Sequence, residues 1–316
     1  MTAVAPAPRP PFLRGLPWSV VRLHRTALWL WIAFVAAGTG WLLRALWLSA
    51  GDERYDPACA PRCIDPEPFD AYIPLHLQGR VMAILPLAVA VFAGGALVGR
   101  ELERGTAALA WVQSVTPTRW LATKLAVPAL LLTGGTTGLT LLFRRVWSTG
   151  HPEDRPGWYE NDIFLSTGPV LVAYVLLGLA LGALAGLLMR RTLSGLGLAF
   201  FATLLVYVLL AMGRTHLWPA TRWTGFEAAR LPGDAERLEV GVITAAGESV
   251  QGPECNLDQP GEFDQCLADN GYTDVYAVGH PASHYWPLQL VETGIVLALA
   301  ALACWAAFAL LRRRTA

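Results

Sequence analysis

The chain has 316 residues, of which 54% are hydrophobic and only 15% are charged. Soluble globular domains carry about a quarter of charged residues, and disordered chains are poor in apolar residues, so both classes are excluded. A secreted disulfide scaffold is excluded because five cysteines are sparse for this length. The apolar residues cluster in stretches of about 20, enough to cross a bilayer core of ~30 Å. This pattern predicts an all-α, polytopic membrane protein.

The whole chain, residues 1–316, is expected to form one transmembrane domain. Near its start, residues 12–26 place apolar side chains along one face among arginines, which predicts an interfacial helix, with a disordered basic tail as the alternative. The predicted spans follow at about 27–48, 80–99, 122–143, 168–189, 193–213 and 287–311. The short segments on the same side of the membrane as the N-terminus hold many arginines and few acids. The positive-inside rule therefore places both termini in the cytoplasm.

The loops expected on the outer side contain four of the cysteines. Cys59 and Cys63 lie in the first outer loop, and Cys255 and Cys266 lie in the last, over residues 214–286. Four cysteines allow three pairings. The local pairs, Cys59–Cys63 and Cys255–Cys266, are the simplest and are the disulfides that we predict.

The last outer loop is expected to form a small, partly ordered cap. Apolar and polar residues alternate over 237–243, which predicts a strand. His280 and His284 follow, but Pro281 disfavours a regular helix between them. A metal site is not expected in the cap, because neither cysteine pair has a histidine at zinc spacing.

The segment between the second and third spans, residues 100–121, carries the clearest local signals. Gly105 suits the left-handed position that ends a helix, and Thr106 can cap a new one. Thr116 followed by Pro117 marks a second helix start, which leads into the third span. The sequence therefore predicts a short separate helix between the two spans.

That short helix, over about residues 106–114, is mostly apolar. It carries Leu109, Trp111 and Val112, and nothing else in the segment is available to bury them. A docking surface for a partner protein is therefore expected, while the alternative places the helix flat in the lipid interface. Trp111 has the largest apolar area and is the expected anchor.

The hairpin formed by the fourth and fifth spans is predicted to be tight, because only residues 190–192 separate them. Gly178, Gly182 and Gly186 recur at every fourth position of the fourth span and give it a small face. Such a face lets another helix approach closely. Packing within the chain is expected, and a dimer contact is the alternative.

Glu292 is the only acid inside a predicted span. A charge at mid-bilayer costs about 2.5–3.5 kcal/mol, so a shallower glutamate still favours a partner. Arg44, near the end of the first span, and Arg80, at the start of the second, lie at the same level. An ion pair of Glu292 with one of them is expected, and contact with a cationic substrate is the alternative.

The sequence offers no catalytic constellation. A phosphate-binding loop needs Gly-Lys followed by Ser or Thr, whereas Lys124, the only lysine, follows Thr123. All the histidines lie outside the predicted spans, which excludes a buried histidine relay. We therefore expect no enzyme activity, no cofactor and no metal in this chain.

Three runs of sequence resemble a known family. Residues 99–106 read Gly-Arg-Glu-Leu-Glu-Arg-Gly-Thr, and residues 111–121 read Trp-Val-Gln-Ser-Val-Thr-Pro-Thr-Arg-Trp-Leu. Residues 280–289 read His-Pro-Ala-Ser-His-Tyr-Trp-Pro-Leu-Gln. Together with the six-span layout, they resemble permease subunits of actinobacterial type-2 ABC exporters. The larger outer loop with its cysteines departs from that family.

The resemblance implies a permease of the bacterial plasma membrane that pairs with a second permease copy and with two copies of a separate ATPase. ATP and Mg²⁺ would bind to the ATPase, which would contact the loop at residues 100–121. The coupling residues that the resemblance implies are Glu101, Glu103, Leu109, Trp111, Val112 and Arg119. An ion-coupled secondary carrier and a membrane sensor or structural subunit remain the alternatives.

The two glutamates of this loop have candidate partners close to them in sequence. Glu101 and Glu103 lie where the second span meets the short helix, and Arg100, Arg104 and Arg119 are close to them in the chain. Ion pairs with these arginines are therefore expected. In the family interpretation the two acids transmit movement between the ATPase and the spans.

Overall fold

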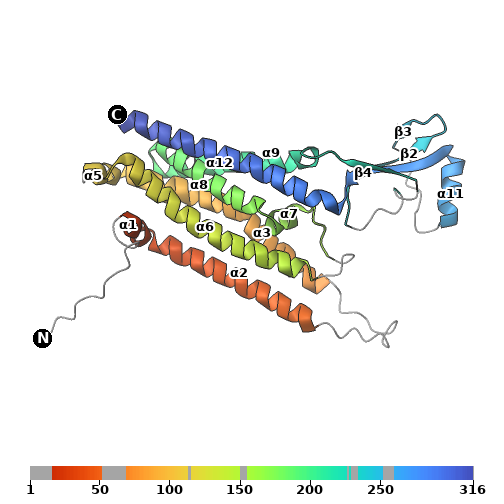
Figure 1. The fold of residues 1–316 in the computed structure, drawn as a ribbon, viewed down its shortest axis with the longest axis horizontal. Coiled ribbons are helices and arrows are strands. Elements are labelled where there is room, and N and C mark those ends of the chain that lie inside the picture. The colour runs from red at the N-terminus through yellow and green to blue at the C-terminus, as the bar shows by residue number, and fades with distance from the viewer. Residues whose placement is uncertain are drawn as a thin grey trace.

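The computed structural model describes residues 16–51, 69–112, 115–149, 155–225, 228, 234–251 and 260–315. Most of these residues are helical, and a small sheet lies beyond one end of the helical bundle (Figure 1). The long helices are α2 (Arg25–Gly51), α3 (Phe69–Phe92), α6 (Pro117–Trp147), α8 (Val170–Met189), α9 (Thr192–Gly213) and α12 (Tyr285–Thr315). Six helical segments built on them are long and apolar enough to cross a membrane, as predicted.

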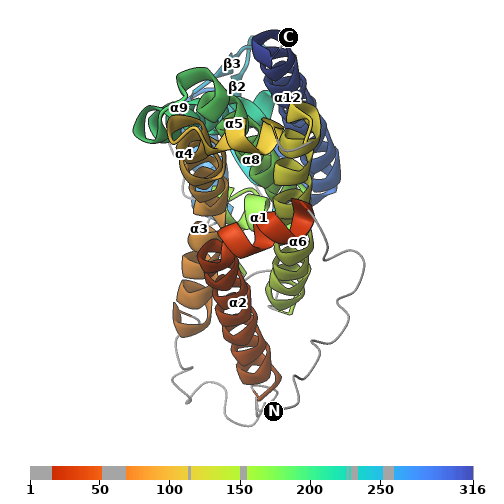
Figure 2. The same ribbon diagram turned by 90° about the vertical axis from the view of Figure 1, so that its left-hand side faces the viewer.

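Shorter elements connect the long helices. The helical ones are α1 (Leu16–Leu23), the π-helix η2 (Ala93–Gly99), α4 (Arg100–Glu103), α5 (Thr106–Val112), α7 (Asn161–Thr167), the 3-10 turns η3 (Arg214–His216) and η4 (Ala282–His284), and α11 (Pro260–Asp269). Helix α1 falls within the segment predicted as a helix and crosses the bundle beside α6 (Figure 2).

Helix α8 is the centre of the bundle. It is apolar on all sides and packs against α3, α9, α12 and α6, as expected for a helix without a solvated face. A Cβ atom added at Gly182 would lie 2.6 Å from the carbonyl oxygen of Ala90 in α3. The predicted packing of the small face within the chain is confirmed. By contrast, α2 lies at the edge and exposes Trp29 and Trp47.

The tight hairpin between α8 and α9 is also confirmed. Helix α8 ends at Met189, and α9 begins at Thr192. Arg190 between them has a φ of 54°, a left-handed conformation that lets the chain reverse at once. The hairpin therefore turns within the residues that the sequence left for it.

The sheet makes the all-α prediction incomplete. Its strands are β1 (Thr221–Thr224), β2 (Glu236–Thr244), β3 (Ser249–Val250) and β4 (Tyr272–His280). They form a four-stranded antiparallel sheet in the order β1-β4-β2-β3. The predicted strand over 237–243 lies within β2. Its neighbours were missed because β4 pairs with strands far away in sequence, and no local pattern records that pairing.

The predicted disulfides stay predictions. Cys266 lies in α11, whereas Cys59, Cys63 and Cys255 lie outside the described residues. Cys304 in α12 is a free cysteine within the apolar bundle.

Candidate functional site

The elbow, residues 100–121, lies at the end of the bundle opposite the sheet (Figure 1). Gly105 has a φ of +70°, so it ends α4 in the left-handed conformation that was predicted. Thr116 caps α6, because its Oγ1 accepts the N–H of Arg119 at 3.4 Å, and Pro117 follows at the first helical position. Both helix boundaries of the elbow are confirmed.

Glu101 has a different partner from the arginines that were predicted. Its Oε1 lies 2.5 Å from Nζ of Lys124, and its Oε2 accepts the indole N–H of Trp120 at 3.2 Å. The same Nζ donates to the carbonyl of Leu97 at 3.0 Å. The Lys124 side chain is only 3% exposed. Leu97 and Glu101 belong to η2 and α4, which directly follow α3. These bonds therefore join the elbow end of the α3 segment, meaning α3 with η2 and α4, to the start of α6.

The Leu97 carbonyl belongs to η2, the π-helical turn that continues α3. Single π-helical turns within helices are frequent at functional sites. The ammonium group of Lys124 also lies 5.3 Å from the ring centroid of Trp120, within range of a cation–π contact. The only lysine of the chain is thus a buried structural link of the elbow.

Glu103 also lacks the predicted arginine partner. Its Oε2 accepts the backbone N–H of Thr192 at 2.8 Å and also the Thr192 hydroxyl. Thr192 begins α9, where backbone N–H groups have no partner within the helix. Glu103 therefore ties α4 to α9. The prediction failed because it used neighbours in sequence, whereas the fold brings α6 and α9 to these acids.

Helix α5 presents a different apolar face from the one predicted. Leu109 and Val112 are 65% and 86% exposed, but Trp111 packs edge-to-face against Trp120, with ring centroids 5.8 Å apart. Residues three apart in a helix lie on one face, so Leu109 and Val112 point the same way. Trp111 lies about 200° around the helix axis from Leu109. Trp111 is half-buried, so the expectation that it is largely exposed is wrong, and its role as an anchor stays a prediction. Leu109 and Val112 form the free surface of α5.

Glu292 lies in a buried ion pair at the other end of the bundle. Its carboxylate accepts Nε–H and Nη2–H of Arg214 at 2.8 and 3.2 Å, and the hydroxyl of Tyr174 at 2.8 Å. The ion pair was expected, but its predicted partners were wrong. Arg44 and Arg80 are both exposed.

The position of Arg214 explains the change of partner. Arg214 directly follows α9, and the η3 turn continues the helical path so that the side chain enters the bundle. A guanidinium group offers paired N–H donors that match a carboxylate. Arg214 falls at the start of the predicted outer loop, where a cation needs no buried partner, so the sequence did not indicate this pair.

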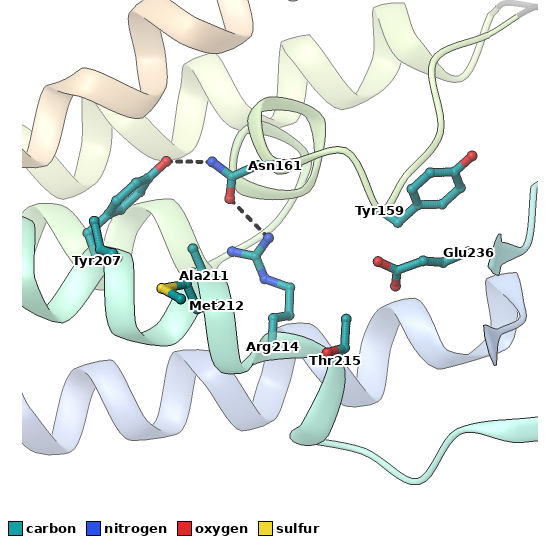
Figure 3. A pocket seen from close by; sticks show the side chains of 9 residues that line it. Tyr159, Asn161, Tyr207, Ala211, Met212, Arg214, Thr215 and Glu236 are labelled. Atoms are coloured by element: carbon teal, nitrogen blue, oxygen red, sulfur yellow. Dashed lines mark hydrogen bonds between the residues drawn. The ribbon is translucent and has the colours of Figure 1, made fainter. Parts of the chain in front are cut away.

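A polar network extends from this ion pair to an open cavity of about 320 Å³. Nη1 of Arg214 donates to Oδ1 of Asn161 at 3.1 Å, and Nδ2 of Asn161 donates to the hydroxyl of Tyr207 at 2.6 Å (Figure 3). Tyr159 and Glu236 line the side toward β2. Burial raises the pKa of the Glu236 carboxyl. The cavity thus combines polar groups with the exposed flank of α9.

A comparison with protein families identifies the chain. The family described as ABC-2 membrane transporter related matches residues 25–214, more than half of the chain. The chain belongs to this family. The match includes the elbow and ends at Arg214, so the sheet and α12 lie beyond it. No curated protein and no solved structure matches the chain.

Membership of this family has three consequences. The chain is a multi-pass membrane protein, in agreement with its six long apolar helices. It is a permease subunit of an ABC transporter, and permeases of this family are non-catalytic membrane subunits. They act with an ATPase subunit in general.

Proposed function

We propose that the chain forms the translocation path of an ATP-driven exporter in a bacterial plasma membrane. In this arrangement two copies of the chain associate with two copies of a separate ATPase. The elbow and both termini face the cytoplasm, and the sheet lies outside. The arginines that flank the elbow support this orientation through the positive-inside rule.

The observation that carries the proposal is the construction of the elbow. Helix α5 leaves Leu109 and Val112 exposed, whereas Glu101 and Glu103 bind α6 and α9. The free face suits a protein partner, because exposed apolar side chains gain free energy when they are buried. The two glutamates give any movement of α5 a direct connection to three spans.

The transport step follows from these connections. When the ATPase copies close on ATP, α5 would move with them, and the Glu101–Lys124 and Glu103–Thr192 contacts would transmit the movement. The spans would tilt and exchange access between the two sides of the membrane. ATP and Mg²⁺ stay on the ATPase, and this chain supplies the path.

The buried charges do not favour the secondary-carrier alternative. A coupling ion or proton needs a carboxylate that can release its partner. Both oxygens of Glu292 are already bonded to Arg214 or Tyr174, and the pair has no net charge. We therefore assign the pair a structural role.

The test is co-expression of the chain with ABC ATPases of the same organism. The proposal expects a detergent-stable complex with equal numbers of the two subunits, and ATP hydrolysis that changes when the permease is present. An ATPase variant lacking its phosphate-loop lysine is the control and should assemble without hydrolysing ATP. A permease that binds no ATPase and transports compounds when driven by a proton gradient alone would instead be a secondary carrier.

A further inference from the structure

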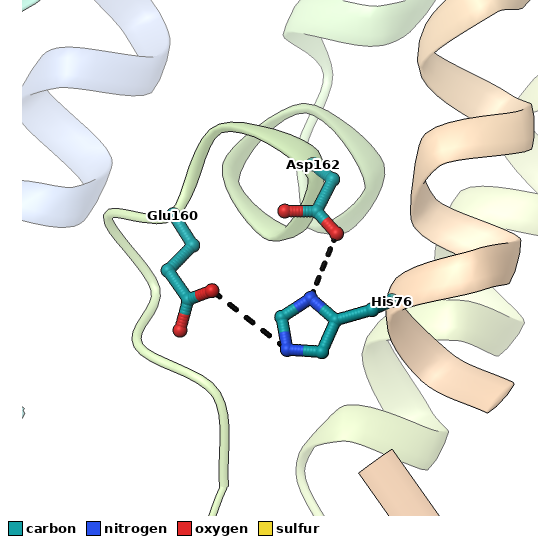
Figure 4. A group of neighbouring side chains, drawn as sticks. All are labelled: His76, Glu160 and Asp162. Atoms are coloured by element: carbon teal, nitrogen blue, oxygen red, sulfur yellow. Dashed lines mark hydrogen bonds and ion pairs between the residues drawn. The ribbon is translucent and has the colours of Figure 1, made fainter. Parts of the chain in front are cut away.

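A histidine lies between two carboxylates at the sheet end of the bundle. His76 belongs to α3, Glu160 directly precedes α7, and Asp162 belongs to α7 (Figure 4). Nδ1 of His76 lies 2.9 Å from Oδ2 of Asp162, and Nε2 lies 3.7 Å from Oε2 of Glu160. The potential ligand atoms of the three side chains lie within 4.8 Å of one another.

The surrounding backbone holds the group in place. The N–H of Gly157 donates to Oε1 of Glu160 at 2.9 Å, which leaves Oε2 facing His76. A Cβ atom added at Gly79 would lie 3.2 Å from the carbonyl oxygen of Asp162, so α3 and α7 are in close contact there. The three side chains are therefore positioned by packed elements and remain partly open to water.

The charge of the group calls for a cation. With a neutral imidazole, the two carboxylates carry two negative charges. In the part of the chain that the structure describes, neither carboxylate has a lysine or arginine nitrogen within 4 Å. A cation bound between the two carboxylates would offset the repulsion between their negative charges.

The geometry suits one kind of cation. A metal-binding histidine commonly donates its other ring N–H to a carboxylate, which aims the free nitrogen at the metal. Asp162 is placed to accept Nδ1–H, and this leaves the Nε2 lone pair directed toward Glu160. Two ligands at about 2.0–2.2 Å from Zn²⁺ in a tetrahedral arrangement lie about 3.3–3.6 Å apart. The separation of 3.7 Å between Nε2 and Oε2 is close to that range.

We propose that His76 and Glu160 bind a divalent transition metal ion, Zn²⁺ by ligand preference, with Asp162 orienting the imidazole. Imidazole nitrogen favours Zn²⁺ and its neighbours in the transition series over Ca²⁺ and Mg²⁺, which prefer oxygen ligands. Water completes the coordination, since the group is partly open to solvent. The ion would join the N-terminal part of α3 to the start of α7, next to the Arg214 network.

The test is a Zn²⁺ titration of the purified permease, carrying an affinity tag without histidines, against a chromophoric chelator. One Zn²⁺ per chain is expected. His76→Gln and Glu160→Gln should each weaken binding at least tenfold, and Asp162→Asn should weaken it about 10–100-fold, as orienting partners do. His216→Gln removes an exposed histidine at the same end of the bundle and should bind as the wild type does.

Two outcomes would overturn the proposal. The first is equal binding by wild type and His76→Gln, or a loss of binding that follows His280→Gln instead, since His280 and His284 form another close pair. The second is stabilisation by protonation without stabilisation by Zn²⁺. If lower pH raises the melting temperature of the wild type relative to that of His76→Gln, and added Zn²⁺ does not raise it, the group is an imidazolium ion pair. X-ray absorption should show nitrogen and oxygen ligands with one imidazole, and it remains informative where a variant folds poorly.

Discussion

Each end of the bundle contains an acid–base pair, but the two pairs join different helices and differ in how deeply their carboxylates are buried. At the elbow, Glu101 and Lys124 link the end of the α3 segment to the start of the next span, and the Glu101 side chain is 15% exposed. At the sheet end, Arg214 and Glu292 link α9 to α12, with a further bond from α8, and Glu292 is fully buried.

The difference concerns which end can move. A carboxylate that water reaches, as at Glu101, can change partners, because solvent replaces part of each lost contact. A carboxylate without access to water is left uncompensated when its pair opens, so the fully buried Glu292 makes the Arg214–Glu292 pair a fixed joint. We infer that α8, α9 and α12 move together at the sheet end and that rearrangement is concentrated at the elbow.

Removal of the Glu292 carboxylate is expected to have the largest effect. Glu292→Gln leaves the guanidinium of Arg214 buried without its counter-charge, and such losses cost about 3–5 kcal/mol of unfolding free energy. The double variant Arg214→Met with Glu292→Leu should recover most of this loss, because apolar pairs of similar volume replace buried ion pairs well. Thermal unfolding in detergent measures both. Equal destabilisation by the single and double variants would remove the fixed joint.

Lys124→Met tests the other side of the comparison. Glu101 loses its charged partner but keeps the indole N–H of Trp120, so a loss of about 1.5–3 kcal/mol is expected, typical of hydrogen bonds to charged groups. The ATPase complex should still assemble while transport per ATP hydrolysed falls. Arg145→Met, on the same helix, exposed and away from the elbow, is the matched control. A loss of stability larger than that of Glu292→Gln would reverse the comparison.

The packed region between the two ends can be probed with two glycines of one hairpin. A Cβ atom at Gly182 would lie 2.6 Å from the Ala90 carbonyl, whereas nothing lies within 4 Å of a Cβ atom at Gly197. Gly182→Ala should therefore destabilise the protein by about 1–3 kcal/mol through overpacking. Gly197→Ala should be neutral or stabilising by about 0.5–1 kcal/mol. Similar melting temperatures for the two variants would contradict close packing of α8 on α3.

Near neutral pH, the smallest expected effect is a pH dependence of stability beside the elbow. Burial, reinforced by Lys124, lowers the pKa of His24 from 6.5 to about 4. The unfolded chain therefore binds a proton that the folded chain refuses, so stability is lost as the pH falls from about 6.5 toward 4. His24→Leu should flatten the melting temperature over that range relative to His216→Gln. An unchanged slope in His24→Leu would show that His24 titrates normally.

The sequence predicted the features that depend on neighbouring residues. Apolar length gave the six spans, and the caps at Gly105 and Thr116 gave the helix boundaries of the elbow. Helical periodicity also contained the exposed face of α5, since Leu109 and Val112 are three residues apart and Trp111 is not on their side. Side-chain size was the wrong guide to which residue of α5 is exposed.

The sequence did not predict the features that depend on distant contacts. Glu292 pairs with Arg214, 78 residues away in sequence, and Glu103 bonds to Thr192, 89 residues away. Charge counting by loop cannot distinguish an arginine in solvent from one that turns into the bundle directly after a helix. The sheet was missed in part for the same reason, because β1 and β4 pair across a long intervening segment.

The most direct test of the central claim is the affinity of the ATPase partner for a permease with an altered α5 face. The double variant Leu109→Asp with Val112→Asp should bind at least about 30-fold more weakly, because interface anchors commonly carry 2 kcal/mol or more. Leu238→Asp with Val240→Asp changes two exposed apolar residues in β2, at the opposite end, and should bind as the wild type does. Unchanged affinity of the α5 variant, measured with purified proteins, would contradict docking of the ATPase through the elbow.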